Sequence, residues 1–213
     1  MKKKIDWLNH GLEFAVVLIG ILIAFQLNNW SIKRDQQQLV NLHLDSIIEE
    51  VKFNQSGLKF SEKKATNDLK NIDDLLQLIA KDAPLDSINM KIFDLLNFGW
   101  LYLRSNAYHS LTESGDIRFV KEFKTRENIV NLYEYFIWTK STNQIAYGSF
   151  SEHVQPYLMK NMDYTTAKAL PRETYENKVF LNGLVTYKYA LNNKINKLKD
   201  CQEKVSEFLK EME

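Results

Sequence analysis

One short segment of the chain gathers side chains that could do chemistry. Residues 108–118 read YHSLTESGDIR, where hydroxyls, carboxylates and an arginine surround a glycine. Such groups could hold a small ligand or transfer a proton. They equally suit a structural role, because Ser-Gly-Asp commonly ends one helix and starts another. The candidate ligand or structural residues are Tyr108, Glu113, Asp116 and Arg118.

The other reactive side chains form no catalytic or metal-binding pattern. The four histidines, at positions 10, 43, 109 and 153, have no second His, Cys or carboxylate at a ligand spacing. Cys201 falls in a predicted helix without a candidate base beside it. The sequence also lacks a glycine-rich phosphate loop and a Gly-x-Ser-x-Gly turn. We therefore expect no enzyme activity, no cofactor and no metal.

Composition favours a helical protein that does not bind nucleic acid. The 213 residues include only seven Gly and three Pro, so long helices are more consistent with the chain than a many-turned sheet. The formal net charge is +1, from 28 basic and 27 acidic residues spread along the sequence. A nucleic-acid binder usually concentrates basic charge on one surface.

The first helix is predicted to be a membrane anchor. Residues 14–25 are uninterrupted apolar, and residues 11–30 make about 30 Å of helix at ~1.5 Å per residue, the thickness of a bilayer core. Trp7 and Trp30 stand where interfacial aromatic belts would be. A cleaved signal peptide is less consistent with the residues that follow, because Gln-Leu-Asn-Asn-Trp offers no small-residue cleavage site.

The flanking charges indicate an orientation and three regions. Three lysines and the terminal amine precede the anchor, whereas only Lys33 and Arg34 closely follow it. The positive-inside rule then predicts a cytoplasmic N-terminus and an extracytoplasmic body. The predicted regions are a basic flank at 1–10, a transmembrane anchor at 11–30 and a helical body at 31–213.

Four anchor positions could matter for packing or function. Glu13 and Gln26 are polar groups near the two ends of the span, where solvation is the simple interpretation. A sharper alternative is an oligomeric ion or proton pathway that uses Glu13, because ionisable groups at membrane depth are often functional. Gly20 and Ala24 form a small-xxx-small pair that would let two anchors approach.

Two long apolar seams predict the architecture of the body. Both alternate steps of three and four residues, which is typical of coiled-coil-like packing. We expect the two helices to pair antiparallel within one chain, although either seam could instead join another protomer. The seams comprise positions 44, 48, 51, 55, 58, 62, 65, 69, 72, 76 and 79, and positions 184, 187, 191, 195, 198, 202, 205, 209 and 212.

Capping signals place the remaining helix ends. Pro84 predicts that the first helix ends near Asp82. Gly115 is the expected C-terminal stop of a short helix at 106–114. Thr125 is the expected cap of a longer helix that ends near Gly148. The expected last helix begins at Pro171 and runs to the C-terminus.

Two segments resemble an uncharacterised bacterial family of single-span membrane proteins. Residues 11–30, GLEFAVVLIGILIAFQLNNW, are similar to that family's anchor, and residues 106–134 contain a similar Y-x-x-L-x-x-S-G-D motif followed by a helix. In this chain Leu12 separates Gly11 from Glu13, which are adjacent in the family pattern. The resemblance implies a bacterial envelope protein of unknown function, and it supplies no activity. The predicted location is the inner membrane, which the chain would cross once.

These observations lead to one functional hypothesis with two alternatives. We expect a membrane-anchored, all-α protein whose helical bundle senses, scaffolds or joins other components of the bacterial envelope. Its expected partners are the lipid bilayer and either a second copy or another envelope protein. A small-ligand receptor or enzyme with a pocket near residues 108–118 is one alternative, and the Glu13 pathway is the other.

Overall fold

Helices are the only regular secondary structure in the described part of the protein. The computed structural model describes residues 7–212, with side chains from residue 11 onward, and this part of the chain contains helices without strands. The all-α prediction is therefore confirmed. The three lysines of the predicted basic flank lie outside the described residues.

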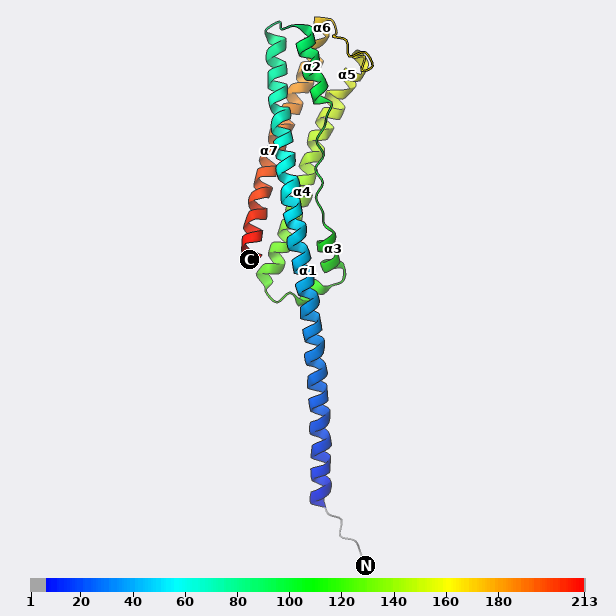
Figure 1. The fold of residues 1–213 in the computed structure, drawn as a ribbon, viewed down its shortest axis with the longest axis vertical. Coiled ribbons are helices and arrows are strands. Elements are labelled where there is room, and N and C mark those ends of the chain that lie inside the picture. Colours follow the sequence, from blue (N-terminus) through cyan, green and yellow to red (C-terminus); the bar gives the residue numbers. More distant parts are fainter. Residues whose placement is uncertain (1–6, 213) are drawn as a thin grey trace, which may run out of the picture.

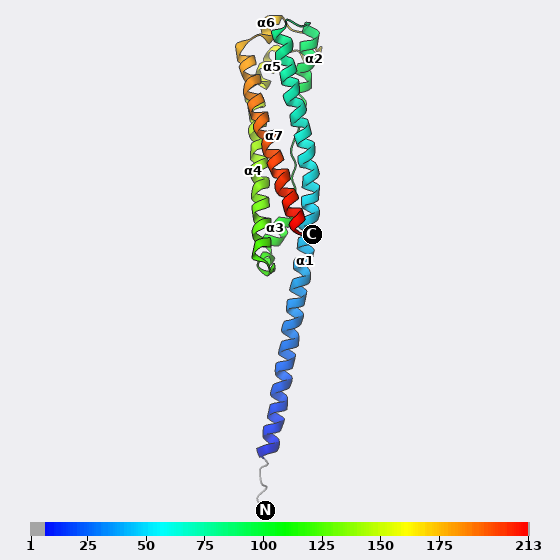
Figure 2. The ribbon, with the colours of Figure 1, turned by 90° about the vertical axis from the view of Figure 1, so that its left-hand side faces the viewer.

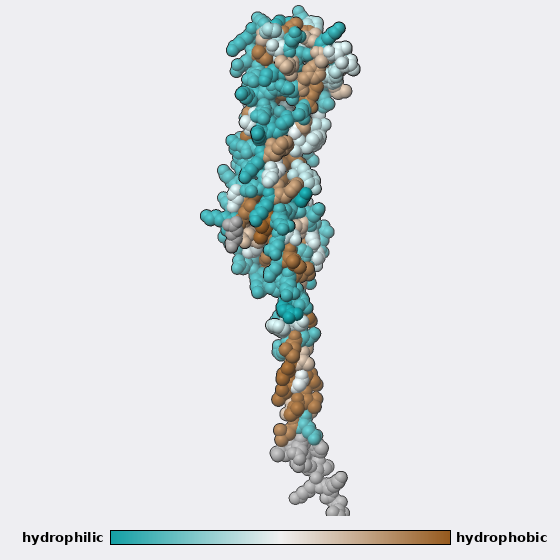
Figure 3. Space-filling view, viewed as in Figure 1, coloured by the Kyte–Doolittle hydropathy of each residue, from teal (hydrophilic) through white to brown (hydrophobic). Residues whose placement is uncertain are grey.

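The helix α1, Trp7–Ala80, runs without a break from the anchor segment into the body. Its 74 residues would extend about 110 Å at ~1.5 Å per residue. Residues 11–28 are exposed and lie outside the body, where they form an apolar stalk (Figures 1 and 3). By length and composition, this is the one helix in the described chain that is apolar enough to cross a membrane.

The far end of α1 is closed by a turn before Pro84. The Ala83 N–H donates to the Leu78 carbonyl at 3.0 Å, and Asp82 takes a left-handed conformation with φ of 54°. This bond satisfies a carbonyl that the last helical turn leaves without a partner. The predicted end near Asp82 is confirmed.

Two further long helices complete the body. The helices α4, Phe123–His153, and α7, Lys178–Met212, pack along each other, and α7 also packs along α1. Lys188 of α7 pairs with Asp73 of α1, whereas Gln202 donates to Glu62 at 2.7 Å. Residue numbers thus rise along one helix while they fall along the other, so α1 and α7 are antiparallel. The end of α7 at Met212 consequently lies at the anchor-proximal end of the body (Figures 1 and 2).

Short elements cover the two ends of the body (Figure 1). The helices α2, Leu85–Leu95, α5, Gln155–Asn161, and α6, Arg172–Tyr175, lie at the end farthest from the anchor. The helix α3, Asn106–Glu113, and the 3₁₀ turn η1, Asp116–Phe119, lie against α1 nearer the anchor. A non-helical segment between α2 and α3 runs along the body and joins the two ends.

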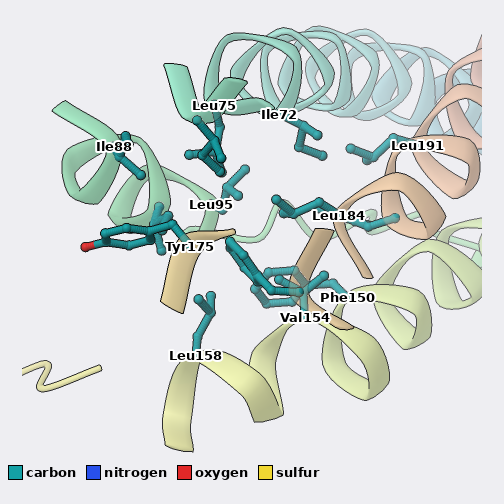
Figure 4. Packing of buried hydrophobic residues seen from close by; sticks show 14 of the residues in the cluster. Ile72, Leu75, Ile88, Leu95, Phe150, Val154, Leu158, Tyr175, Leu184 and Leu191 are labelled. Atoms are coloured by element: carbon teal, nitrogen blue, oxygen red, sulfur yellow. The ribbon is translucent and has the colours of Figure 1, made fainter. Parts of the chain in front are cut away.

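The body contains two apolar cores separated along its length. The distal core, shown in Figure 4, combines α1, α2, α4, α5, α6 and α7. The anchor-proximal core combines α1, α3, α4 and α7 with Leu103 and Val120. Fully buried members of the distal core include Ile72, Leu75, Ile88, Ile92, Val154, Phe180, Leu184 and Leu191, and those of the anchor-proximal core include Ile47, Val51, Leu58, Leu111, Ile129, Cys201 and Val205.

Three predicted helix ends differ from the structure. α4 begins at Phe123, so Thr125 lies inside its first turn rather than capping it. The same helix continues past Gly148 to His153, because a single glycine lowers helix propensity without stopping a helix that has a buried face. Pro171 precedes the four-residue α6, and the last helix starts only at Lys178.

Candidate functional site

The predicted segment 108–118 forms the α3–η1 corner, which is attached to α1 by a polar contact. Gly115 has φ of 78° and makes the turn between the two elements. The Asp116 carboxylate then lies 3.2 Å from Nε2 of His43 on α1. Both side chains are largely buried. This pair fixes the corner against the long helix.

A buried carboxylate on α1 holds the start of α3. Glu50 accepts hydrogen bonds from the Tyr133 hydroxyl and, at 3.1 Å, from the Ala107 backbone N–H. Tyr108 stacks on Tyr133, with ring centroids 4.3 Å apart. Burial, followed by the neighbouring Glu50, raises the pKa of Tyr133 well above its ordinary value. The phenol therefore remains a donor, and Glu50 serves as a cap for the first turn of α3.

The other two predicted residues point to different surroundings. Glu113 lies 3.4 Å from His109 on the exposed side of α3, and the Arg118 guanidinium lies over the ring of Phe119. The four predicted side chains are thus spread over separate contacts. An open groove of about 430 Å³ beside α3 is lined instead by His43, Ser46, Glu49, Glu50, Arg104, Asn106, Ala107 and Ser110.

The non-helical segment before α3 is fixed by a single amide. Asn54, fully buried on α1, donates to the Arg104 carbonyl at 2.9 Å and accepts from the Arg104 N–H at 2.7 Å. The Arg104 guanidinium lies 3.5 Å from the ring centroid of Phe53 on the same helix. Because the amide satisfies both backbone groups of Arg104, this segment can cross the body without strand pairing.

A polar layer lies between the two apolar cores. We define it as the buried residues Ser61, Asp68, Thr139, Asn143, Lys194 and Lys197, which come from α1, α4 and α7. Such a layer costs burial energy, and it disfavours packings that shift one helix along another. Its chemistry is consistent with setting the register of the three long helices.

The charged members of this polar layer have shifted acidities. Burial lowers the pKa of Lys194 to about 8, against the opposing effect of Asp68. Burial also raises the pKa of Asp68, although Lys64 pairs with it. The Lys194 ammonium lies 3.4 Å from the Gly99 carbonyl and over the ring of Phe98. The contacts of Lys194 are internal, whereas Lys64 and Asp68 also line an open surface groove of about 390 Å³.

Aromatic rings rather than carboxylates surround the second buried lysine. The Lys197 ammonium lies over Tyr135 and Trp138, 3.9 and 2.8 Å from their ring centroids. The indole of Trp138 is also half exposed in an open groove of about 540 Å³ between α4 and α7. The other groove residues include Glu134, Glu207, Glu211 and Phe208.

The predicted anchor residues lie on the exposed stalk. Gly20 has open space around the position of an added Cβ, so a second helix could approach it. Residues 11–28, which include Glu13, Ala24 and Gln26, are exposed in the single chain. Within the described residues, no group of three or more His, Cys, Asp or Glu side chains is arranged to hold a metal ion.

The contacts that organise this region join residues far apart in the sequence. His43 meets Asp116 across 73 positions, and Glu50 meets Tyr133 across 83. Neither pair has a fixed spacing that a motif could capture. The sequence gives one indication of these contacts: Glu50 is a charged residue that stands next to the predicted apolar seam.

No protein-family model, curated protein or solved structure matches the chain. The fold and its contacts therefore define only a class: an all-helical protein with one N-terminal helix that is long and apolar enough to cross a membrane.

Proposed function

We propose that this is a single-pass membrane protein whose helical body is a non-enzymatic interaction or scaffolding module. The observation that carries the proposal is the contrast along α1. Residues 11–28 expose large apolar side chains, whereas the body buries its own two cores. Exposed apolar surface of this extent is unfavourable in water and favourable in lipid.

Two alternative explanations of an apolar N-terminal helix are less consistent with these observations. A core helix of a soluble protein would be buried, but the apolar window of α1 is wholly outside the body. A cleaved signal peptide would be followed by a cleavage site with small residues. Instead, α1 continues as one helix from the apolar stretch to its first buried residue, Val40.

The direction of insertion is part of the proposal. Three lysines before the anchor outnumber the two basic residues after it, which supports a cytoplasmic N-terminus and an extracytoplasmic body. The resemblance of residues 11–30 and 106–134 to a bacterial single-span family supports the inner membrane as the location. Membership of that family is itself a proposal that rests on these two segments.

Contacts in the predicted site favour an interaction role over catalysis. Asp116 and Tyr108 are engaged with His43 and Tyr133, so they act in packing and capping. The open groove between α4 and α7 and a helical bundle with a buried polar layer are consistent with a body that binds another protein at its surface. Gly20 and Ala24 would allow a second copy to pack beside the anchor, so a homo-oligomer is one partner that we propose.

The test is membrane retention of the full-length chain. We expect the protein to remain in the membrane fraction after alkaline carbonate washing and to dissolve in detergent. Replacing Leu18 and Leu22 with Arg should release it, because each Arg near the centre of a span costs about 3 kcal/mol on insertion scales. A matched pair, Leu39→Arg and Leu42→Arg, lies beyond the span on exposed positions of the same helix and should leave retention unchanged.

The interaction role needs a separate measurement. Crosslinking in intact membranes, followed by mass spectrometry, should give a specific dimer or a reproducible adduct with another envelope protein. Full-length protein recovered from the aqueous fraction without detergent would contradict the anchor. A strictly monomeric protein without adducts would contradict the scaffolding role while leaving the anchor intact.

A further inference from the structure

The turn between η1 and α4 forms the part of the body that lies nearest the stalk. We call residues 118–126, RFVKEFKTR, the basal loop; they comprise this turn, the end of η1 and the first turn of α4. In both views the chain here reaches farther toward the exposed stretch of α1 than any other part of the body (Figures 1 and 2). Any bilayer that held the stalk would therefore have this loop as its nearest neighbour in the body.

The basal loop concentrates positive charge. Its four basic residues and one acidic residue give a formal charge of +3, whereas the whole chain carries only +1. The rest of the protein is therefore net negative, at 1 − 3 = −2. Lys121 is exposed, and Lys124 keeps 75% side-chain exposure although its ammonium lies 3.2 Å from Glu211. Basic residues near an anionic membrane are attracted to its surface.

Aromatic rings alternate with these charges. Phe123, the first residue of α4, is 70% exposed, which is unusual for a phenylalanine. The Arg126 guanidinium lies 5.5 Å from its ring centroid, and Arg118 lies 4.6 Å from that of Phe119. Arg126 also donates to the Val120 carbonyl, which fixes the loop backbone. An exposed ring between cations is typical of segments that rest in a lipid headgroup layer.

The length of the stalk limits how the loop reaches a membrane. The Asp116–His43 contact sets the corner level with His43, thirteen residues beyond Trp30, or about 20 Å along the helix. The loop lies closer than this, and headgroups extend about 5–7 Å beyond the hydrocarbon core. Transmembrane helices tilt by about 20° on average, which would bring one side of the body down. The loop meets headgroups only if α1 tilts toward it far enough to close the rest of this distance.

We propose that the basal loop binds the headgroups of anionic lipids and thereby sets the tilt of the body over the membrane. This inference rests on the membrane anchoring proposed above. The occupant is a lipid surface because the tether holds the loop beside one at all times, and because the charge of the loop is opposite to that of anionic headgroups.

The experiment uses the full chain reconstituted in liposomes and probes two depths. A fluorophore on Glu127→Cys, an exposed position one residue beyond the loop, reports the loop without removing any of its residues. A second fluorophore on Leu18→Cys reports the anchor, and the native Cys201 is fully buried. Quenchers are placed on lipid headgroups for the first probe and on acyl chains for the second. With 30 mol% phosphatidylglycerol, we expect headgroup quenching at position 127 to be at least twofold stronger than in pure phosphatidylcholine.

Charge variants test whether the basic residues cause this quenching. Lys121→Glu with Lys124→Gln lowers the loop charge from +3 to 0 and should remove the difference between the two lipid mixtures. The matched control, Lys160→Glu with Lys168→Gln, makes the same charge change at exposed positions outside the loop and should retain it. Adding 1 M salt should also remove it, because the screening length falls to about 3 Å.

The outcomes separate the two proposals. If position 127 is quenched equally in both lipid mixtures while position 18 is quenched by acyl chains, the anchor stands and headgroup binding by the loop is wrong. If position 18 escapes acyl-chain quenching, the anchor itself is wrong. Thermal unfolding of each variant distinguishes a lost contact from a lost fold, and Lys121→Glu alone provides a milder variant with half the expected effect or more.

Discussion

Glu50 is the residue on which the attachment of α3 most depends. Replacing it with alanine would leave the Tyr133 hydroxyl, on a ring only 2% exposed, and the Ala107 N–H without their acceptor. Each buried donor left unpaired costs about 1–3 kcal/mol. We expect Glu50→Ala to lower the free energy of unfolding by about 2–4 kcal/mol, measured by denaturant titration in detergent.

The neighbouring residue supplies the control for this prediction. Glu49 is exposed on the same helix turn, so Glu49→Ala should change stability by less than about 0.5 kcal/mol. Tyr133→Phe removes one donor but keeps the Ala107 contact, and we expect an intermediate effect. Equal stability of Glu50→Ala and Glu49→Ala would show that the capping contact contributes nothing.

Lys194 gives the body a predictable dependence on pH. Its pKa falls from 10.5 to about 8 in the folded protein, so between these values the unfolded chain binds more protons and stability rises with pH. The burial penalty is fully present below pH 8 and is relieved toward pH 10.5. Relative to Lys194→Met, the wild-type protein should gain about 2–3 kcal/mol between pH 7 and pH 10.

Comparison with the methionine variant isolates this effect. Burial raises the pKa values of Tyr187 and Cys201, and their ionisation in the unfolded chain would lower stability in the same alkaline range. These groups are common to both proteins and cancel in the difference. Parallel stability curves for wild type and variant would contradict the burial of a charged Lys194.

At the scale of elements, α1 carries its polar core residues at a regular interval. Asn54, Ser61 and Asp68 are seven residues apart and alternate with apolar positions along the buried stripe of the helix. Asn54 forms two hydrogen bonds to Arg104, whereas the Ser61 hydroxyl has no hydrogen-bond partner. The buried stripe of α1 thus contains one polar side chain, Asn54, that fixes the segment at Arg104, and another, Ser61, that holds no other segment.

A matched pair of alanine variants distinguishes these two roles. Asn54→Ala should destabilise the body by about 2–4 kcal/mol, because both backbone groups of Arg104 lose their partner. Ser61→Ala should be neutral or stabilising by up to about 1 kcal/mol, since it removes a buried hydroxyl without a matching bond. Hydrogen exchange at the Arg104 amide should accelerate only in the first variant. Similar losses in both variants would argue against this assignment.

The same stripe explains which part of the fold could be predicted from the sequence. Val51, Leu58, Ala65, Ile72 and Ile79 of the predicted seam are buried. Between them the prediction selected Gln55, Glu62 and Leu69, but the buried positions are one residue earlier, at Asn54, Ser61 and Asp68.

The cause of this error is physical. The same one-residue shift occurs at Ile48 and Leu76, which lie next to the buried Ile47 and Leu75. The predicted series at 48, 55, 62, 69 and 76 has three apolar residues, whereas the buried series one residue earlier has two. Hydrophobic periodicity assumes an apolar core, so it favours the wrong series when three of the five core residues are polar. For the candidate site, the turn at Gly115 follows from its residue type, but the contacts of Asp116 and Tyr108 do not. Their partners, His43 and Tyr133, are brought together only by the packing of three distant helices.

At the scale of the whole molecule, the anchor and the body are energetically separate although one helix joins them. Residues 11–28 make no buried contact with the body, and the first fully buried side chain of α1 is Val40. Removing residues 1–30 should therefore leave both apolar cores complete. We expect residues 31–213 to fold alone, to remain in the aqueous fraction and to unfold cooperatively, as expected for a single-domain body.

Calorimetry and denaturant titration of the truncated body test this separation. The free energy of unfolding of the truncated body should lie within about 1 kcal/mol of that of the full chain in detergent. The truncation moves the N-terminal end of α1, with its unpaired backbone N–H groups, to solvent-exposed turns and removes no buried contact. A large loss of stability would mean that the stalk supports the body through contacts made in the membrane or between copies. In that case the body would be an obligate part of a larger membrane assembly rather than an independent module on a tether.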